Sequence, residues 1–265
     1  RDSSTSRGLG DVYKRQLSLA SPEEPLELTS NMLSPGFEDN SKGWVCNGFS
    51  PQSNDAFELK EGTYYCEIWS GWGNVADGDI HQIVELPNGN YQLTVLAQNI
   101  QESNKAIPQK GAYVYANNAR KELSLTGKYT LDFVVVDNQA KIGVNTIGCT
   151  GNKVSIDDFH IYYTGFDDDA QFAEFRQMIQ EGEALLESPQ HADSLAMLAK
   201  AVEEAKAVTK TEDIAAKANI LRKAITASQV SVGDYALFLE AIQRSEQVLA
   251  EGLPNGNNEL KAVID

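Results

Sequence analysis

The chain has 265 residues, with 38 acidic against 22 basic side chains and a net charge of −16. Because nucleic acids and anionic membranes are bound through clustered Lys and Arg, this charge balance excludes both classes of partner. The length allows one large or two ordinary domains, and no apolar run approaches the roughly 20 residues that a membrane-spanning helix needs.

The first sixteen residues, RDSSTSRGLGDVYKRQ, show no apolar periodicity. Residues 6–16 match the translated index-side adapter of transposase-based sequencing libraries, and residues 1–5 fit its upstream part. We therefore expect residues 1–16 to be a disordered, translated artefact that replaces the natural N-terminus. Residues 17–30 begin with LSLAS, which suits the end of a signal peptide, so we expect a linker or a signal-peptide remnant there.

Residues 31–165 follow the period of two that is typical of β-strands. The segment YQLTVLAQ, for example, places Tyr91, Leu93 and Val95 on one face. Turn signals such as Asn88-Gly89 recur every ten residues or so. Short strands without intervening helices predict an antiparallel β-sandwich over 31–165.

The last of these strands, VSIDDFHIYY at 154–163, changes its phase. Its apolar residues occupy even positions before Asp157 and odd positions after Asp158. A phase slip inside a strand predicts a β-bulge at which one acidic side chain turns inward. An inward carboxylate without a partner would be costly.

After residue 165 the apolar period becomes that of a helix, and three amphipathic helices with short connections predict an antiparallel three-helix bundle over 166–232. The segment FAEFRQMIQEGEALLE from Phe172 then aligns with YALFLEAIQRSEQVLA from Tyr235, which indicates an internal repeat of roughly 60 residues. We therefore expect 233–265 to be an incomplete, truncated second repeat of a longer multidomain protein.

Three segments in this order, SPGFEDNSKGW (34–44), IHQIVELPNGNYQLTV (80–95) and VSIDDFHIYY (154–163), resemble carbohydrate-binding modules of the family 4, 9 and 22 type. The resemblance implies a galactose-binding-like jelly roll that binds a polysaccharide or oligosaccharide. The helical part is similar to the small three-helix repeats of secreted Bacteroidetes polysaccharide-degrading enzymes. Together these resemblances imply an extracellular or cell-surface protein with covalently linked catalytic or other domains outside this sequence.

The resemblance also implies a structural calcium ion, held by Glu38 and by one of Asp157 and Asp158, with backbone carbonyls completing the oxygen shell. The alternative is that these carboxylates are satisfied by backbone amides or by a turn.

Candidate sugar-binding residues follow from the chemistry of pyranose rings, which stack on aromatic faces and need planar polar groups for their hydroxyls. In YYCEIWSGWGN, Tyr65 and Trp69 share a strand face, and Trp72 lies between two glycines in a polar loop. Trp72 is the strongest candidate, whereas Trp69 fits the core or a cleft equally well. Tyr113 and Asn117 offer a second ring and amide.

Catalysis finds little support in the sequence. Glu67, Asp77 and Asp79 are the carboxylates that a glycosidase pair would draw on, but a sequence gives no separation between them. None of the three histidines stands in a metalloprotease motif, and no nucleophile elbow or phosphate loop occurs. We therefore expect non-catalytic carbohydrate binding that tethers a larger enzyme, with an adhesion or structural protein-interaction module as the alternative.

The three cysteines, Cys46, Cys66 and Cys149, are far apart and lack the spacing of a zinc site. They are interpreted as small buried apolar side chains, or as one disulfide with a third, free thiol.

Overall fold

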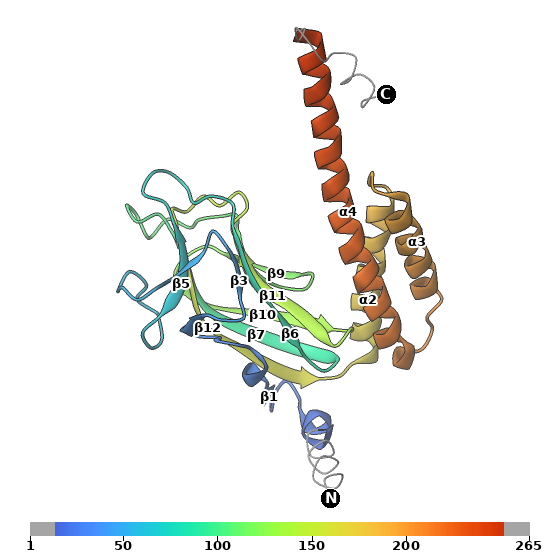
Figure 1. Cartoon of the computed structure of the whole chain (residues 1–265). Coiled ribbons are helices and arrows are strands. Elements are labelled where there is room, and N and C mark those ends of the chain that lie inside the picture. Colours follow the sequence, from blue (N-terminus) through green and yellow to red (C-terminus); the bar gives the residue numbers. More distant parts are fainter. Residues whose placement is uncertain (1–13, 252–265) are drawn as a thin grey trace, which may run out of the picture. The chain divides into compact units, whose positions relative to one another are not determined.

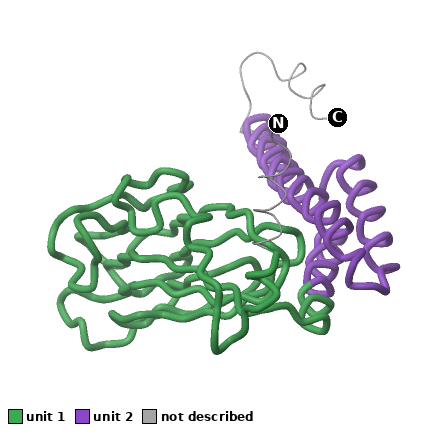
Figure 2. Tube along the Cα trace, turned by 90° about the horizontal axis from the view of Figure 1, so that it is seen from below, with its two compact units in different colours: residues 1–174 green, residues 175–265 purple. Residues whose placement is uncertain are grey.

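The computed structural model describes residues 14–251 (Figure 1). They belong to two compact units, residues 1–174 and residues 175–265, which are coloured separately in Figure 2. Most of the predicted artefact, residues 1–13, lies outside the described part, and residues 14–19 are helical. Between residues 14 and 251, no helix combines the length and the apolarity that crossing a membrane requires.

The first unit contains two antiparallel β-sheets, as the period of two predicts. The six-stranded sheet has the order β10-β7-β12-β5-β4, with β1 also paired to β12. Its strands are β1 (Leu26–Glu27), β4 (Ser50–Gln52), β5 (Tyr65–Trp69), β7 (Gly89–Ile100), β10 (Gly127–Val135) and β12 (Lys153–Gly165). The five-stranded sheet has the order β3-β6-β11-β8-β9. Its strands are β3 (Val45–Asn47), β6 (Asp79–Glu85), β8 (Ala112–Ala116), β9 (Ala119–Leu123) and β11 (Gln139–Asn145).

One hydrophobic core lies between the two sheets, because each strand turns every second side chain inward. Both sheets contribute fully buried aliphatic side chains to it, among them Leu93, Val95, Val114, Ile142 and Ile156. The strand β2 (Glu38–Ser41) and the short 3-10 helix η1 (Thr29–Asn31) lie outside the two strand orders.

An aromatic cluster lies in this core. The ring of Trp44 lies 5.2 Å from that of Phe37 and 5.0 Å from that of Phe159, and its indole N–H donates to the carbonyl of Ser34 at 3.1 Å. Phe37 and Phe159 are fully buried and Trp44 nearly so. Trp44 is thus a core residue.

The sandwich begins earlier than the sequence predicts. Residues 17–30 were expected to be a linker or signal-peptide remnant, but Leu26 pairs with Tyr163 in β1 and Leu28 is buried in the core. The hydroxyl of Thr29 accepts the backbone N–H of Ile161 at 3.0 Å. A strand of two residues is too short to display a period, so the sequence pattern could not reveal it.

The helical part contains α2 (Asp168–Leu186), α3 (Ala192–Lys206) and α4 (Thr211–Glu251). Helices α2, α3 and α4 pack closely where Gly182 allows it, since a Cβ there would lie 2.9 Å from Val202 Cγ2 and 3.3 Å from Leu221 Cδ1. The predicted boundary between 232 and 233 is wrong, because α4 runs straight through it. Glycine inside a helix lowers its stability by only about 1 kcal/mol relative to alanine, so Gly233 does not end α4.

Candidate functional site

The loop between β5 and β6 holds the most exposed large apolar side chain described. Trp72 is 96% exposed. Its backbone is fixed by Ser70, whose hydroxyl accepts the N–H of Trp72 at 3.3 Å and donates to its carbonyl at 2.8 Å. Gly73 follows with φ at +74°, a conformation that favours glycine. The expected exposure of Trp72 is confirmed, and the loop presents the ring from an ordered backbone.

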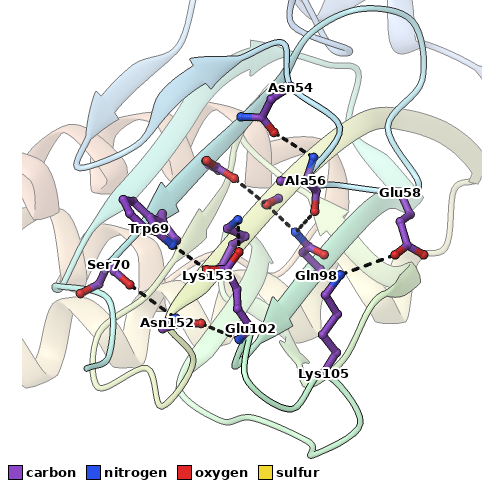
Figure 3. A network of polar contacts seen from close by, with 12 residues as sticks. Asn54, Ala56, Glu58, Trp69, Ser70, Gln98, Glu102, Lys105, Asn152 and Lys153 are labelled. Carbon is purple, nitrogen blue, oxygen red and sulfur yellow. Dashed lines mark hydrogen bonds and ion pairs between the residues drawn. The ribbon is translucent and has the colours of Figure 1, made fainter. Parts of the chain in front are cut away.

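Trp69, at the end of β5, is 55% exposed and oriented by polar contacts (Figure 3). Its indole N–H donates to Glu102 Oε2 at 3.0 Å, and Lys153 Nζ lies 6.0 Å from the centre of its ring. Gly71 packs on the ring, because a Cβ at Gly71 would lie 3.4 Å from it. Trp69 therefore belongs to the surface and not to the core, and its ring is held in one orientation.

Charged and amide groups lie directly beside this ring. Glu102 Oε1 accepts a hydrogen bond from Lys153 Nζ at 2.5 Å, and its backbone N–H donates to Asn152 Oδ1 at 2.9 Å. The hydrogen bonds from Lys153 and then from Trp69 lower the pKa of Glu102. Its carboxylate is therefore charged at neutral pH. We call Trp69, Trp72, Glu102 and Lys153 the indole platform.

Tyr65 does not belong to the accessible surface, which corrects its assignment as a sugar-binding residue. Its ring is fully buried and packs 5.6 Å from Phe57, which the loop after β4 places over the outer face of β5. Its hydroxyl donates to Glu67 Oε2 at 3.1 Å and contacts Asn54 Oδ1 at 2.8 Å. The side-chain Nε2 of Gln98 also holds this loop in place, because it donates a hydrogen bond to the carbonyl of Ala56 at 3.3 Å (Figure 3).

A second group of polar and aromatic side chains lies on the outer face of the five-stranded sheet. Asp79 is at its centre: its Oδ1 accepts the hydroxyl of Tyr115 at 2.9 Å and Nδ2 of Asn145 at 3.4 Å, and its Oδ2 lies 2.6 Å from His81 Nδ1. Tyr113, half-buried, lies two residues along β8 from Tyr115, with ring centres 6.1 Å apart. We call these five residues the polar-aromatic face.

Three features shape this face. Gly143 lies on β11 opposite His81 and Tyr115, and a Cβ there would come 2.8 Å from the hydroxyl of Tyr115. Burial and then the charge of Asp79 raise the pKa of Tyr115, so its hydroxyl stays protonated and donates. The Arg120 guanidinium lies over the Tyr113 ring, 4.9 Å from its centre, and makes a cation–π contact with it.

The sequence analysis did not bring Asp79, His81, Tyr115 and Asn145 together as one group. Only the pairing of β11 with both β6 and β8 places these four side chains side by side. Strand order is a tertiary property that a local period does not encode.

Asn117 serves the turn after β8, at the opposite end of this strand from Tyr113. It has φ at +51°, and its Oδ1 accepts the backbone N–H of Lys141 at 3.0 Å. Asn and Asp tolerate this conformation and cap such turns with their side chains. Its side-chain oxygen is therefore engaged by the fold, and Asn117 lies apart from Tyr113 rather than beside it.

Glu67 and Asp79, two of the carboxylates considered for catalysis, do not form a pair. Glu67 lies on the outer face of the six-stranded sheet, buried under the loop after β4, whereas Asp79 lies on the outer face of the five-stranded sheet. Asp77 accepts the backbone N–H of Gly148 at 3.0 Å in a loop. Because a glycosidase needs two carboxylates on either side of one bond, Glu67 and Asp79 cannot serve together.

The predicted bulge is present, and it selects Asp157. The register of β12 shifts between Asp157 and His160, and Asp158 has φ at +52°. Asp157 is fully buried, whereas Asp158 Oδ1 lies 2.9 Å from His160 Nε2. Asp157 is thus the inward carboxylate. Asp158 pairs with His160 and is not a candidate metal ligand.

Backbone amides of the segment before β5 hold the two remaining candidate metal ligands. Asp157 Oδ2 accepts the N–H of Glu61 at 2.8 Å, and Glu38 Oε1 accepts those of Thr63 and Tyr64 at 2.7 and 2.8 Å. Burial raises the pKa of Asp157 to about 7, with smaller contributions in the same direction from the neighbouring charges of Asp158 and Glu38. No group of three or more His, Cys, Asp and Glu side chains that could hold a metal occurs within residues 14–251.

No protein-family model and no curated protein sequence matches the chain. Among solved structures, TmCBM61 in complex with β-1,4-galactotriose aligns at 18% identity over 50% of this chain and 97% of that chain, with a TM-score of 0.40. A cyclase from Fischerella sp. TAU aligns at 12% identity over 54% and 99%, with a TM-score of 0.41. The CBM22-1 xylan-binding domain of Paenibacillus barcinonensis Xyn10C aligns at 12% identity over 51% and 95%, with a TM-score of 0.38.

Proposed function

We propose that the sandwich is a non-catalytic carbohydrate-binding module of the galactose-binding-like, jelly-roll type and that the indole platform contacts its glycan. The observation that carries the proposal is the exposure of two indoles in one short segment, since Trp72 is 96% exposed and Trp69, three residues before it, is 55% exposed. Exposing two indoles to water costs free energy. Exposed apolar surface of this kind often marks a recognition site.

The chemistry of the platform suits a saccharide. Indole faces accept the C–H patches of pyranose rings, and the charged groups of Glu102 and Lys153 lie beside Trp69 to hydrogen-bond sugar hydroxyls. Because Trp69 is already fixed by Glu102, little side-chain entropy is lost when a ring stacks on it.

Affinity electrophoresis against plant and mucin polysaccharides, followed by a glycan array, tests the proposal. We expect Trp72→Ala to weaken retention by roughly tenfold or more at an unchanged unfolding midpoint. Phe166→Ala is the matched control, since Phe166 is 53% exposed in the same unit but lies outside the platform. Equal retention of wild type and Trp72→Ala, or no glycan retained by the wild type, contradicts the proposal.

The polar-aromatic face is the second region where the same glycan could be held. Tyr113→Ala in the same assay separates the two regions. The Tyr113 side chain is half-buried and makes none of the described side-chain hydrogen bonds, so its removal should leave the fold intact. Loss of retention in Trp72→Ala with full retention in Tyr113→Ala assigns binding to the platform alone. Loss only in Tyr113→Ala moves the site to the face.

The role in a larger protein follows from the proposed binding. A module without chemistry of its own raises the effective substrate concentration of whatever is covalently linked to it. We therefore place the sandwich in a secreted or cell-surface polysaccharide-active protein, with the helical part as spacer.

The structural calcium ion that the sequence resemblance implies would involve Glu38 and Asp157. Glu38 and Asp157 hold the same segment, residues 61–64, and the oxygens of both carboxylates retain further lone pairs. We infer that these two side chains hold the ion and that calcium would offset the cost of burying the Asp157 charge.

Thermal unfolding of the full chain with calcium and with a calcium chelator tests this inference. A ligand that binds only the folded state must raise the unfolding midpoint, so we expect a higher midpoint with calcium. Glu38→Gln should abolish the difference. An identical midpoint in both conditions would contradict calcium binding. It would not contradict the proposed sugar binding.

The rival function is an adhesion or structural module that binds protein. The exposed apolar side chains of α4 favour it, since Leu237 is 65% and Phe238 56% exposed. Retention of a protein partner by a chain that retains no glycan would establish the rival.

A further inference from the structure

Two cysteines lie on facing strands at one edge of the sandwich. Cys46 is the middle residue of β3 in the five-stranded sheet, where it is opposite the buried Ile80. Cys66 lies on β5 of the six-stranded sheet, opposite Pro51 and the buried Ile156. Because side chains that are opposite each other share a face, both thiols lie on the core side of their sheets.

The chain path brings the two strands together. After β3 the chain crosses from one sheet to the other through Gly48 and Phe49 and enters β4, where Pro51 pairs with Cys66. Gly48 has φ at +85°, and a Cβ there would come 2.9 Å from Ile68 Cδ1 on β5. This crossing therefore holds β3 tightly against the strand that carries Cys66.

The strand pairing and the crossing at Gly48 place the two thiols near each other on the core side of facing strands. Burial raises the pKa of Cys66, and the nearby Cys46 raises it further. Cys46 is exposed at the edge strand, so a solvent-borne oxidant can reach it, whereas Cys66 is fully buried. An exposed thiol with a second thiol nearby is the arrangement in which a mixed disulfide is resolved by the second cysteine.

We propose that Cys46 and Cys66 form a disulfide that links the two sheets when the folded protein meets a small-molecule disulfide such as oxidised glutathione. The Cys46 thiolate attacks one sulfur of oxidised glutathione and releases one glutathione thiolate. Cys66 then loses its proton and attacks the Cys46 sulfur of the mixed disulfide, which releases the second glutathione. Two protein thiols are oxidised by two electrons, and one glutathione disulfide is reduced to two thiols.

Cys149 takes no part in this reaction. Its Sγ lies 3.3 Å from Asn99 Oδ1 and accepts the backbone N–H of Gly151 at 3.3 Å, in the loop before β12. It is buried and has no second cysteine as a neighbour among the described residues. Cys149 therefore provides the matched control for a thiol of the same fold.

The test uses the full chain, reduced, freed of reductant and shown by circular dichroism to be folded. After incubation with oxidised glutathione it is unfolded in N-ethylmaleimide, and its free thiols are counted by intact mass and peptide mapping. We expect the count to fall from three to one in the wild type. In Cys149→Ser we expect no free thiol, with residues 46 and 66 joined in one peptide pair.

The partner variants complete the test. Cys46→Ser changes an exposed position, and we expect it to keep both remaining thiols reduced. Cys66→Ser should stop at the glutathione adduct on Cys46, which dithiothreitol removes. Three alkylated thiols in the folded wild type, or a lasting glutathione adduct on its Cys46, overturns the proposal.

Discussion

The two regions of the sandwich that carry tryptophan place the same side chain in opposite environments. Around Trp44 the indole packs between Phe37 and Phe159 and is 8% exposed, whereas Trp69 and Trp72 are 55% and 96% exposed. Both regions also hold carboxylates, with the pKa of Asp157 raised by burial and that of Glu102 lowered by Lys153 and Trp69. One region contributes to the stability of the core, and the other exposes apolar surface to solvent.

The largest expected effect comes from removing the buried indole. Trp44→Ala deletes the ring between two buried phenylalanines, so we expect the free energy of unfolding to fall by about 3–5 kcal/mol. Urea unfolding followed by circular dichroism measures it. A loss as small as that of an exposed residue would show that the aromatic cluster does not stabilise the sandwich.

The buried carboxylate should make stability depend on pH in calcium-free buffer. Asp157 has a raised pKa in the folded state, so the unfolded chain releases this proton from about pH 3.8 upward and the folded chain only near pH 7. Its contribution to stability is therefore full at low pH and falls as pH rises to 7, by at most about 1.4 kcal/mol per pH unit.

Asp157→Asn is the control for this prediction. It removes the titrating group, so urea unfolding between pH 4 and 8 should show a flatter pH dependence than the wild type, whatever its absolute stability. An unchanged slope would assign the pH dependence to other groups.

At the indole platform we expect a smaller pH dependence of stability, with the opposite sign. The lowered pKa of Glu102 means that its contribution is present above the ordinary value of 4.5 and is lost as pH falls through the folded-state pKa. Because Glu102 is partly exposed, we expect less than about 1 kcal/mol. Tryptophan fluorescence should report the release of Trp69 in acid, and Glu102→Gln should show no such transition.

The smallest effect on stability is expected for Trp72→Ala, within about 0.5 kcal/mol, because the ring buries almost no surface. Together with Trp44→Ala in the same unfolding assay, it measures the contrast between the two tryptophan regions. A loss near that of Trp44→Ala would mean that Trp72 packs against the fold in solution.

Much of this architecture could be predicted from local patterns. The period of two in 31–165 predicted the antiparallel sheets, and the phase slip in VSIDDFHIYY predicted the bulge at Asp157 and Asp158. The glycines around Trp72 predicted its exposure. These features were accessible because each depends on residues that are close in sequence.

The pattern could not say which strand face stays open. Tyr65 and Trp69 share one face of β5, yet the loop with Phe57 covers Tyr65 and leaves Trp69 half-exposed. The cluster around Asp79 likewise needs β11 between β6 and β8. Strand order and loop placement depend on contacts between distant residues, so a single sequence reveals them only through the folded chain.

The helical repeat separates the two sources of information most clearly. Sequence alone determined that residues 172–187 and 235–250 have the same amphipathic stripe, with Phe175 equivalent to Phe238 and Ile179 to Ile242. Only the tertiary structure decided that Phe175 is 2% exposed and Phe238 56% exposed. The physical reason is that periodicity specifies which face of a helix is apolar, whereas burial requires another element to pack against that face.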